Sequence, residues 1–372
     1  MFENYEAPKE LRPSDPRFGC GPSLIPLNFI KKLHHDGVHL IGTSHRKAPI
    51  KNLCKGIQEG LKEYFNVPAD YTICLGNGGA TFLFDMIGLT AVDKKITHFT
   101  CGEFSEKWYK SSKLIPWIDA EQFSVDYGKG INGENIADSD VIAVTLNETS
   151  TGVQLSKLPE VDDKTLLAID ATSGAGQIPC DVSKTDIFFF SPQKVFASEG
   201  GLFVAILSPK CRERVLKNEN DKSRYVPGIM NFKTCIDNSD KNQTYNTPSV
   251  STLFFLNEQI KEMNKIGYSK IITEAKTKAD FLYGWANDKS YLSVYIEEEE
   301  FRSTAVACID VDEKINVNEL LKKLADDGIV YGIDSYRKLG RNQFRIALFH
   351  NVTFDNLKKL TQLLSHAIEG EL

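Results

Sequence analysis

Three short apolar segments, each followed at once by polar residues, constrain the fold of this chain more than any other feature. They cover residues 141–146, 166–169 and 187–190. Each is apolar on both faces, which is typical of strands in a parallel sheet that helices cover on both sides. The intervals of about 20 to 25 residues between them leave room for crossover connections, so we expect parallel pairing. The sequence therefore predicts an α/β fold, with a mostly parallel central sheet in a large domain.

Polar residues at the ends of these segments predict a ligand site. Ligands of open α/β sheets bind outside the carboxyl ends of the strands, and these ends carry Asp170 and, 24 residues later, Lys194. Val195 and Phe196 flank the lysine, and an apolar site lowers the pKa of an amine and favours Schiff-base formation. The alternative is a lysine that extends to solvent. A lysine and a carboxylate together suit pyridoxal 5'-phosphate (PLP), because the lysine bonds to its aldehyde and the carboxylate keeps its pyridine nitrogen protonated.

A glycine-rich turn at residues 76–81 lies between a predicted strand, residues 71–75, and a predicted helix. This arrangement aims free backbone N–H groups at a phosphate, although such a turn can also be purely structural. Phe104 follows another predicted strand, residues 95–100, and could stack on a flat ring or belong to the core. A phosphate-binding turn would complete a PLP site with the lysine and the aspartate.

Two basic segments could hold an anionic substrate. The first contains His45, Arg46 and Lys47, and the second carries four cations between positions 337 and 345. Arginine binds carboxylate and phosphate groups in a bidentate manner. Arg345 lies within a strand pattern, where a charge needs a partner. Solvated basic loops are the alternative for both segments.

Composition and charge narrow the class of protein. A net charge of −6 and a pI of about 5.8 give no indication of nucleic acid or an anionic membrane as a partner. No apolar run reaches the ~20 residues of a membrane helix, and the N-terminus lacks the features of a signal peptide. Eight scattered cysteines without a C-x-x-C pair predict free thiols in a reducing cytoplasm, and neither they nor the seven histidines predict a metal site.

The expected organisation is an N-terminal arm at residues 1–18, a large domain at 19–264 and a small α+β domain at 265–372. Residues 228–246 are predicted to be irregular, between helical patterns that cover 50–65, 209–221, 250–263 and 271–285. After residue 291 the pattern changes. The expected order there is strand 304–309, helix 316–326, strand 329–333, strand 344–347 and helix 353–368.

Motifs along almost the whole chain resemble those of the phosphoserine aminotransferases, a family of class V aminotransferases with PLP fold type I. The matching segments are F-G-C-G-P-S, G-T-S-H-R-K-A-P, L-G-N-G-G-A-T, C-G-E-F-S, N-E-T-S-T-G-V, I-D-A-T-S-G-A-G, S-P-Q-K-V-F-A-S-E-G-G-L, K-N-Q-T-Y-N-T-P and Y-R-K-L-G-R-N-Q-F-R. As a set they are highly specific, and they look closest to the actinobacterial branch.

The resemblance implies that the chain binds PLP through particular residues. Lys194 would carry the internal aldimine and move a proton between Cα and C4′, and Asp170 would pair with the pyridinium. Phe104 would stack on the ring, and Thr149 would bond on the side of the phenolate oxygen. The residues implied at the cofactor phosphate are Ala80, Thr81 and Gln193.

The resemblance also implies a homodimer with shared active sites, because Asn246 and Thr247 would reach the cofactor phosphate of the neighbouring subunit. His45, Arg46 and Arg345 would bind the carboxylate and phosphate of the substrate. The spacing of the last basic segment departs from that of many relatives. Which residue contacts the substrate phosphate therefore stays open among Arg337, Lys338 and Arg341.

The implied reaction is reversible amino transfer from glutamate to 3-phosphohydroxypyruvate, which gives 2-oxoglutarate and O-phospho-L-serine in L-serine biosynthesis. Some relatives also aminate an intermediate of pyridoxine biosynthesis, and the sequence leaves that activity open. The nearest alternative is another class V enzyme, such as an alanine–glyoxylate transaminase or a cysteine desulfurase. A desulfurase needs a cysteine on a mobile loop, whereas Cys308 lies in an apolar strand pattern. A PLP-binding regulator would need a DNA-binding module, which no segment provides.

Overall fold

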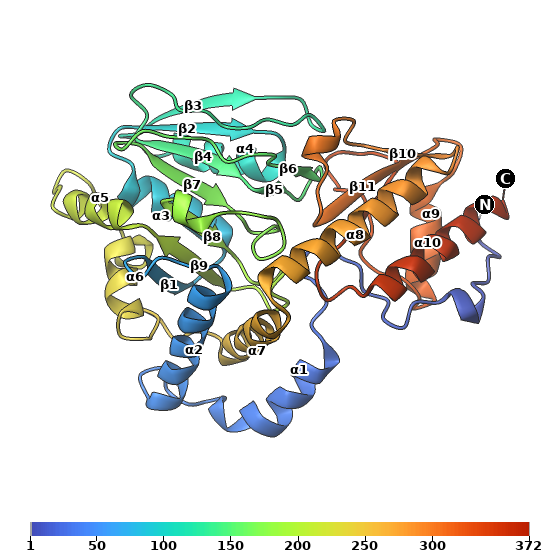
Figure 1. Cartoon of the computed structure of the whole chain (residues 1–372), viewed down its shortest axis with the longest axis horizontal. Helices are drawn as coiled ribbons and strands as arrows, with labels where there is room; N and C mark the ends of the chain where they lie inside the picture. The colour runs from blue at the N-terminus through green and yellow to red at the C-terminus, as the bar shows by residue number, and fades with distance from the viewer. Residues whose placement is uncertain (1, 372) are drawn as a thin grey trace.

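The computed structural model describes residues 2–371 and has a large part and a small part side by side (Figure 1). A seven-stranded sheet forms the centre of the large part, in the order β1-β9-β8-β7-β4-β2-β3. β9 runs antiparallel to both of its neighbours, and every other pair in the sheet is parallel. The predicted mostly parallel α/β sheet is therefore confirmed. Its strands are β1 (Thr72–Asn77), β2 (Lys95–Thr100), β3 (Asp119–Ser124), β4 (Val141–Thr145), β7 (Leu166–Asp170), β8 (Ile187–Phe190) and β9 (Leu202–Leu207).

The central sheet is buried on both faces because its strands are apolar at successive positions. Phe188 and Phe190 point into one apolar cluster, and Ile187 and Phe189 point into the other. α2 and α7 belong to the first cluster, and α3 to α6 belong to the second. The helices of the large part are α1 (Leu27–Lys32), α2 (Ala48–Tyr64), α3 (Ala80–Ala91), α4 (Glu103–Lys113), α5 (Pro209–Glu219), α6 (Phe232–Ser239) and α7 (Val250–Ile266).

The small part is built on a three-stranded antiparallel sheet in the order β10-β11-β12. Its apolar side chains belong to the same cluster as one face of the large sheet, so the core is continuous between the two parts. A short two-stranded ladder, β5 (Asn147–Glu148) with β6 (Val153–Gln154), lies at the junction in Figure 1. The elements of the small part are α8 (Tyr268–Asn287), β10 (Leu292–Val294), β11 (Val306–Val311), α9 (Val317–Asp326), β12 (Gln343–Ala347) and α10 (Phe354–Glu369).

The expectation that residues 228–246 are irregular is wrong in part, because α6 lies within them. Asn231 precedes this helix, and its side-chain oxygen accepts hydrogen bonds from the backbone N–H groups of Lys233 and Thr234. Phe232 and Ile236 are buried against the sheet. A helix cap and an i, i+4 apolar pair therefore outweigh the polar composition of the segment.

The strand predicted at residues 329–333 is also wrong. Gly328 and Gly332 have φ angles of 73° and 80°, which turn the backbone away from an extended path at both ends. Tyr331 forms an isolated bridge with Arg17, and Ile333 O accepts a hydrogen bond from Arg345 N–H at 2.9 Å. The segment therefore connects the N-terminal arm to the small part instead of adding a strand.

The N-terminal arm packs closely on the rest of the chain. The side chains of Phe2 and Phe18 are fully buried, and Ser14 N–H donates to Asn356 Oδ1 at 2.8 Å. All eight cysteines are free thiols, and only Cys180 is partly accessible. No helix within residues 2–371 combines the length and the apolar character needed to cross a membrane.

Candidate active site

The expected pair, Asp170 and Lys194, follows two adjacent strands of the central sheet. β7 and β8 are parallel neighbours, with Asp170 opposite Phe189. β4 pairs with the other side of β7 and places Thr145 opposite Asp170. Since the carboxyl ends of these parallel strands meet at one edge of the sheet, the loops that follow them can build one site.

Lys194 is held in a partly buried position by the segment that follows the arm. Its Nζ donates a hydrogen bond to Cys20 O at 2.6 Å, and the Ser23 hydroxyl donates to Lys194 O. Burial lowers the pKa of Lys194 to about 8, and the charge of nearby Arg345 acts in the same direction. A lysine with this pKa exists in part as the neutral amine at neutral pH, which is the nucleophilic form.

Asp170 is a buried carboxyl group with 4% of its surface exposed. Its Oδ1 accepts hydrogen bonds from the backbone N–H and the hydroxyl of Thr172. Burial raises the pKa of Asp170 to about 6, and the charge of Glu148 adds to this rise, whereas Lys194 opposes it. A cationic N–H partner beside the carboxylate would offset the cost of burial, which suits a protonated pyridine nitrogen.

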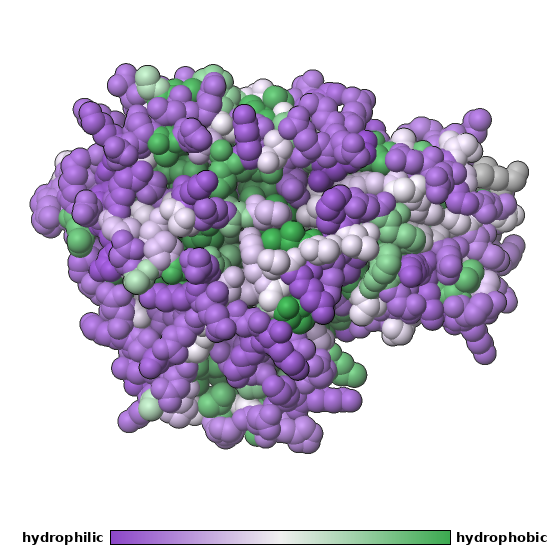
Figure 2. Space-filling view, viewed as in Figure 1, coloured by the Kyte–Doolittle hydropathy of each residue, from purple (hydrophilic) through white to green (hydrophobic). Residues whose placement is uncertain are grey.

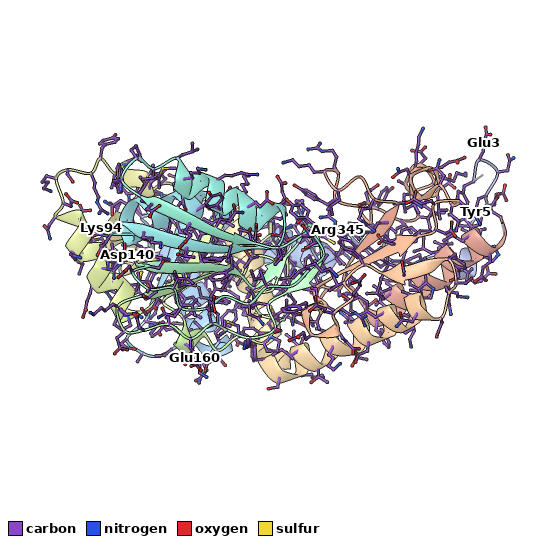
Figure 3. The ribbon with its side chains drawn as sticks, turned by 90° about the horizontal axis from the view of Figure 1, so that it is seen from above. Glu3, Tyr5, Lys94, Asp140, Glu160 and Arg345 are labelled. Atoms are coloured by element: carbon purple, nitrogen blue, oxygen red, sulfur yellow. The ribbon has the colours of Figure 1, made fainter. Side chains whose placement is uncertain are left out.

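Arg345 extends from β12 of the small part to the loop after β4, at the junction of the two parts (Figure 3). Its Nη1 donates to Thr149 O at 3.1 Å, and its guanidinium lies 5.4 Å from the centroid of the Tyr336 ring. The Arg345 Nε is buried and has no hydrogen-bond partner among the described residues. Nη2 donates no hydrogen bond among the described residues either, and it is not among the buried unpartnered atoms, so the guanidinium retains a donor for a carboxylate. Thr149 Oγ1 is 2.8 Å from Ser173 Oγ, next to Asp170 in the following strand-end loop.

Phe104 lies in the first turn of α4, close to the small part. Its ring centroid is 5.9 Å from that of Tyr336, at an interplanar angle of 60°. Tyr336 thus contacts both Phe104 and the Arg345 guanidinium. These contacts connect the expected ring-stacking residue to an expected substrate residue.

The glycine-rich turn has the geometry that a phosphate site requires. β1 ends at Asn77, Gly78 has a φ angle of 123°, and α3 begins at Ala80 without a side-chain cap. The backbone N–H groups at the start of the helix are therefore open to an anion. A Cβ placed on Gly79 would lie 3.5 Å from Ser191 Oγ, and Ser191 Oγ is hydrogen-bonded to Gln193. The turn and the segment before Lys194 are thus close together, and the predicted contacts of Ala80, Thr81 and Gln193 with a phosphate stay a prediction.

These features fit PLP by their own chemistry. The edge of the sheet presents an amine of lowered pKa, a buried carboxyl of raised pKa and open N–H groups at a helix start. The Arg345 guanidinium, whose Nη2 has no hydrogen-bond partner among the described residues, adds a donor for the acid group of an amino-acid substrate. No group of three or more His, Cys, Asp or Glu side chains that could hold a metal ion occurs within residues 2–371.

Comparison with known proteins identifies the family. Residues 131–332 match the family described as aminotransferase class-V. The phosphoserine aminotransferase of Corynebacterium glutamicum (strain R) is 41% identical over 98% of this chain and 97% of its own length. This chain belongs to the phosphoserine aminotransferase family. The family resemblance expected from the sequence is confirmed.

Solved structures of the phosphoserine aminotransferase family share the fold. A crystal structure from Cytophaga hutchinsonii superposes with a TM-score of 0.85 at 25% identity and covers 95% of this chain and 99% of its own. The PLP-bound phosphoserine aminotransferase of Trichomonas vaginalis superposes with a TM-score of 0.80 at 20% identity, covering 94% and 99%. The predicted PLP fold type I is therefore confirmed.

Four further residues of the expected site form a cluster of their own. They are His45, Arg46, Asn246 and Thr247, which the family resemblance places at the substrate or the cofactor. Thr247 Oγ1 is 3.2 Å from His45 Nδ1, and Arg46 Nη2 donates to Tyr245 O at 3.2 Å. Asn246 is exposed beside them. Within residues 2–371, no contact of these side chains is to Lys194, Asp170 or Arg345. The cluster lies beside the glycine-rich turn, since Asn77 Nδ2 donates to Thr247 O at 2.8 Å, and no hydrogen bond among the described residues joins it to Arg345.

The three remaining basic candidates differ in their partners. Arg341 makes two hydrogen bonds to the carboxylate of Asp310 and lies 4.5 Å from the centroid of the Tyr295 ring. Lys338 forms an ion pair with Glu103. Arg337 is exposed and has no ion-pair partner in the described part of the chain. Arg337 is therefore the member of this group that is free to bind an anion.

Glu148 and Tyr336 are two residues of the site that the sequence did not predict. Glu148 is fully buried between the strand end of β4 and α4, and Tyr336 connects Phe104 to Arg345. An acidic residue two positions after an apolar strand segment is the available signal for Glu148. Tyr336 had no comparable signal, because its partners are distant in the sequence.

Proposed function

We propose that the protein is a phosphoserine transaminase that uses PLP to transfer the amino group of L-glutamate to 3-phosphohydroxypyruvate, in L-serine biosynthesis. The observation that carries this proposal is the meeting of Lys194, Asp170 and Arg345 where parallel strands end. Membership of the phosphoserine aminotransferase family supports the same activity. An amine, an acid and a cation at one edge match the needs of amino-acid transamination.

The cofactor would be held by side chains from several strand ends. Asp170 would hold the pyridine nitrogen, Phe104 would cover the ring and Thr149 would bond near the phenolate oxygen. The phosphate would be bound by Ala80, Thr81 and Gln193. When bound, PLP supplies an electron sink for the electrons of the broken Cα–H bond.

Lys194 would act as the base that moves the substrate proton. A pKa of about 8 makes its amine neutral in part near pH 7, so it can accept the proton from the substrate Cα. Arg345 would orient the α-carboxylate through Nη2, which has no hydrogen-bond partner among the described residues. Arg337 would bind the phosphate of the phosphorylated substrate, since Lys338 and Arg341 already have acidic partners.

The proposed enzyme is a homodimer with shared active sites. His45, Arg46, Asn246 and Thr247 form a cluster without a hydrogen bond to Lys194 among the described residues, and three of these four are exposed. Large apolar side chains are also exposed between residues 27 and 41. They are those of Leu27, Ile30, Val38 and Ile41. Figure 2 shows hydrophobic residues at its lower edge, where Figure 1 places α1, on an otherwise mostly hydrophilic surface. A second copy would bury this apolar surface and bring the cluster to the other subunit's cofactor.

We also propose the division into an arm (1–18), a large domain (19–264) and a small domain (265–372). The change of direction at Gly267, between α7 and α8, supports this boundary. The free thiols support a cytoplasmic location. An assay with the phosphorylated intermediate of pyridoxine biosynthesis tests whether the enzyme shares that second activity of some relatives.

An absorbance spectrum of the purified protein tests the proposed function. We expect a yellow band that disappears when O-phospho-L-serine is added and persists when L-serine is added. Lys194→Ala should fold but show no turnover. A protein that takes up no PLP contradicts the Lys194–Asp170 site. A yellow protein that responds to alanine and ignores phosphoserine indicates an alanine–glyoxylate transaminase instead.

The structure disfavours the cysteine desulfurase alternative. Cys308 lies within β11, and its thiol is buried with 1% of the residue exposed. Burial raises the pKa of Cys308 far above its ordinary value. A thiol in this position is protonated and inaccessible, so it cannot act as the nucleophile that a desulfurase needs.

A further inference from the structure

The helix that carries Phe104 is capped by residues that lie more than 40 positions away in the sequence. Gly102 precedes α4 and offers no side-chain cap. Instead, Glu103 N–H donates to Ser150 Oγ at 3.1 Å. Phe104 N–H donates to Glu148 Oε1 at 3.3 Å, and Ser105 N–H donates to Glu148 Oε2 at 2.9 Å. The first three N–H groups of α4 therefore depend on the segment after β4.

Glu148 serves this helix with both of its carboxylate oxygens. Oε1 also accepts from the backbone N–H and the hydroxyl of Ser150, at 3.2 and 2.7 Å, and Oε2 lies 2.9 Å from the Ser105 hydroxyl. The residue is fully buried. Gly102 makes the approach possible, since a Cβ there would lie 2.4 Å from Glu148 Cγ. A buried carboxylate with this many donors fixes its surroundings strongly.

The same segment also carries a residue of the candidate cofactor site. Thr149 follows Glu148 directly, and its carbonyl oxygen accepts from Arg345. Phe104 contacts Tyr336, which in turn lies beside the Arg345 guanidinium. Glu148 is thus at the centre of a set of contacts that fixes Phe104 relative to Thr149.

We propose that Glu148 is a positioning residue, whose carboxylate holds the first turn of α4 so that Phe104 covers the PLP ring. This proposal rests on the proposed function, because it assigns Phe104 to the ring. Glu148 itself would touch neither substrate nor cofactor. It acts through the backbone of Phe104 and Ser105.

The charge of Glu148 gives it a second effect at the same site. Its negative charge contributes to the raised pKa of Asp170 and to the raised pKa of Tyr336, in both cases after burial as the main cause. A negative charge near Asp170 also stabilises a proton on a pyridine nitrogen bound there. Replacement of Glu148 by a neutral residue should therefore alter the spectrum of bound PLP as well as its affinity.

Glu148→Gln removes the negative charge of the side chain and keeps its size. The amide has one acceptor oxygen, so its NH₂ group must face either Phe104 N–H or Ser105 N–H, and one backbone donor loses its acceptor. Glu106→Gln is the matched control, because Glu106 lies on the same helix and pairs with Lys110 at 3.0 Å. Ser150→Ala is a milder second variant. It removes the acceptor of Glu103 N–H and leaves the carboxylate in place.

The experiment measures three properties of the full-length protein. Hydrogen exchange of the segment 102–106 is followed by mass spectrometry without cofactor. PLP affinity and the visible circular dichroism of bound PLP are measured by titration. For Glu148→Gln we expect exchange at least about tenfold faster and PLP binding about tenfold weaker, the effect of one charge-assisted hydrogen bond. We also expect altered circular dichroism. Ser150→Ala should change the exchange rate, the PLP affinity and the circular dichroism in the same direction as Glu148→Gln, but to a smaller extent. Glu106→Gln should leave all three properties unchanged.

Two results would overturn the proposal. In the first, segment 102–106 of Glu148→Gln exchanges hydrogen faster, but the PLP affinity and the circular dichroism of bound PLP equal those of the wild type. That result would mean that the carboxylate only stabilises a helix. In the second, exchange of the segment does not change. Failure of the proposed function is distinguishable, because the wild-type protein would then bind no PLP, while the exchange measurement on cofactor-free protein would still report whether Glu148 caps α4.

Discussion

At the scale of single residues, the site depends on opposite pKa shifts in two buried groups. Burial disfavours the charged form of each, so it lowers the pKa of Lys194 to about 8 and raises that of Asp170 to about 6. The two groups oppose each other's shifts only weakly, because each is influenced more by its own burial. Burial therefore favours the neutral form of both groups.

The lowered pKa of Lys194 predicts how the stability of the cofactor-free protein depends on pH. Lys194 has a pKa of about 8 in the folded state, and an unfolded lysine has a pKa of ~10.4. At pH values between these two, the unfolded chain binds more protons at this residue than the folded chain. The free energy of unfolding should therefore rise with pH across this window, relative to Lys194→Met. Urea unfolding of both proteins at pH 7, 8, 9 and 10 measures the difference. The advantage of the methionine variant should be largest at pH 7 and shrink by pH 10, and a constant difference would contradict the shift.

Arg345 and Arg337 are predicted to bind different acid groups of the substrate. Arg345 binds the α-carboxylate, and Arg337 binds the phosphate. Arg345→Ala should raise KM for both glutamate and phosphoserine by ~10- to 100-fold, because both have an α-carboxylate and one charge-assisted contact is lost. Arg337→Ala should raise KM for phosphoserine alone. Steady-state kinetics with each substrate provide the comparison.

Arg341→Ala is the control, because Arg341 is paired with Asp310 and should leave both KM values near those of the wild type. If Arg337→Ala raised KM equally for glutamate and phosphoserine, Arg337 would be assigned to the α-carboxylate that both share. That result would refute its role at the phosphate.

At the scale of elements, α6 depends on the cap supplied by Asn231. Its side-chain oxygen accepts from two N–H groups at the helix start. Asn231→Ala should therefore lower the free energy of unfolding by about 1 kcal/mol. Chemical denaturation measures this loss. Asn287→Ala, at an exposed position at the end of α8, should change stability far less, and an equal loss in both variants would show that the cap contributes nothing specific.

Much of the fold was predictable because its strands are locally encoded. The apolar runs of β4, β7 and β8 and the polar residues after them gave both the parallel sheet and the position of Asp170 and Lys194. Helix α6 was not predicted, because the polar composition of its segment indicated an irregular structure and the Asn231 cap was not recognised. The cap of α4 could not be inferred, since its acceptor Glu148 comes from a distant segment. Non-local hydrogen bonds have no periodicity in the sequence.

At the scale of the whole molecule, one chain contains two separate sets of the expected site residues. Lys194, Asp170 and Arg345 lie where strands of the large part meet the small part. His45 and Thr247 contact each other beside Asn77 at the glycine-rich turn, and neither forms a hydrogen bond with the first set among the described residues. If both sets act on one substrate, the second set comes either from another subunit or from a movement within the chain. The proposed homodimer accounts for this separation.

Mixing two inactive variants tests whether active sites are shared between subunits. Lys194→Ala removes the amine, and Arg46→Ala removes a cation of the other set, so each homodimer should have low activity. A mixed dimer has one site with both defects and one site with neither. Random exchange of equal amounts makes half of the dimers mixed, so activity should return to about a quarter of the wild-type value.

The control is a mixture of Lys194→Ala with Asp170→Ala, two residues of the same set, because every site of a mixed dimer then contains one defect and activity should stay low. Unfolding and refolding the proteins together ensures exchange of subunits. If the Lys194→Ala and Arg46→Ala mixture also stays inactive after exchange, both residues serve the same subunit's site, and the chain must then close the two sets onto each other by a movement within one subunit.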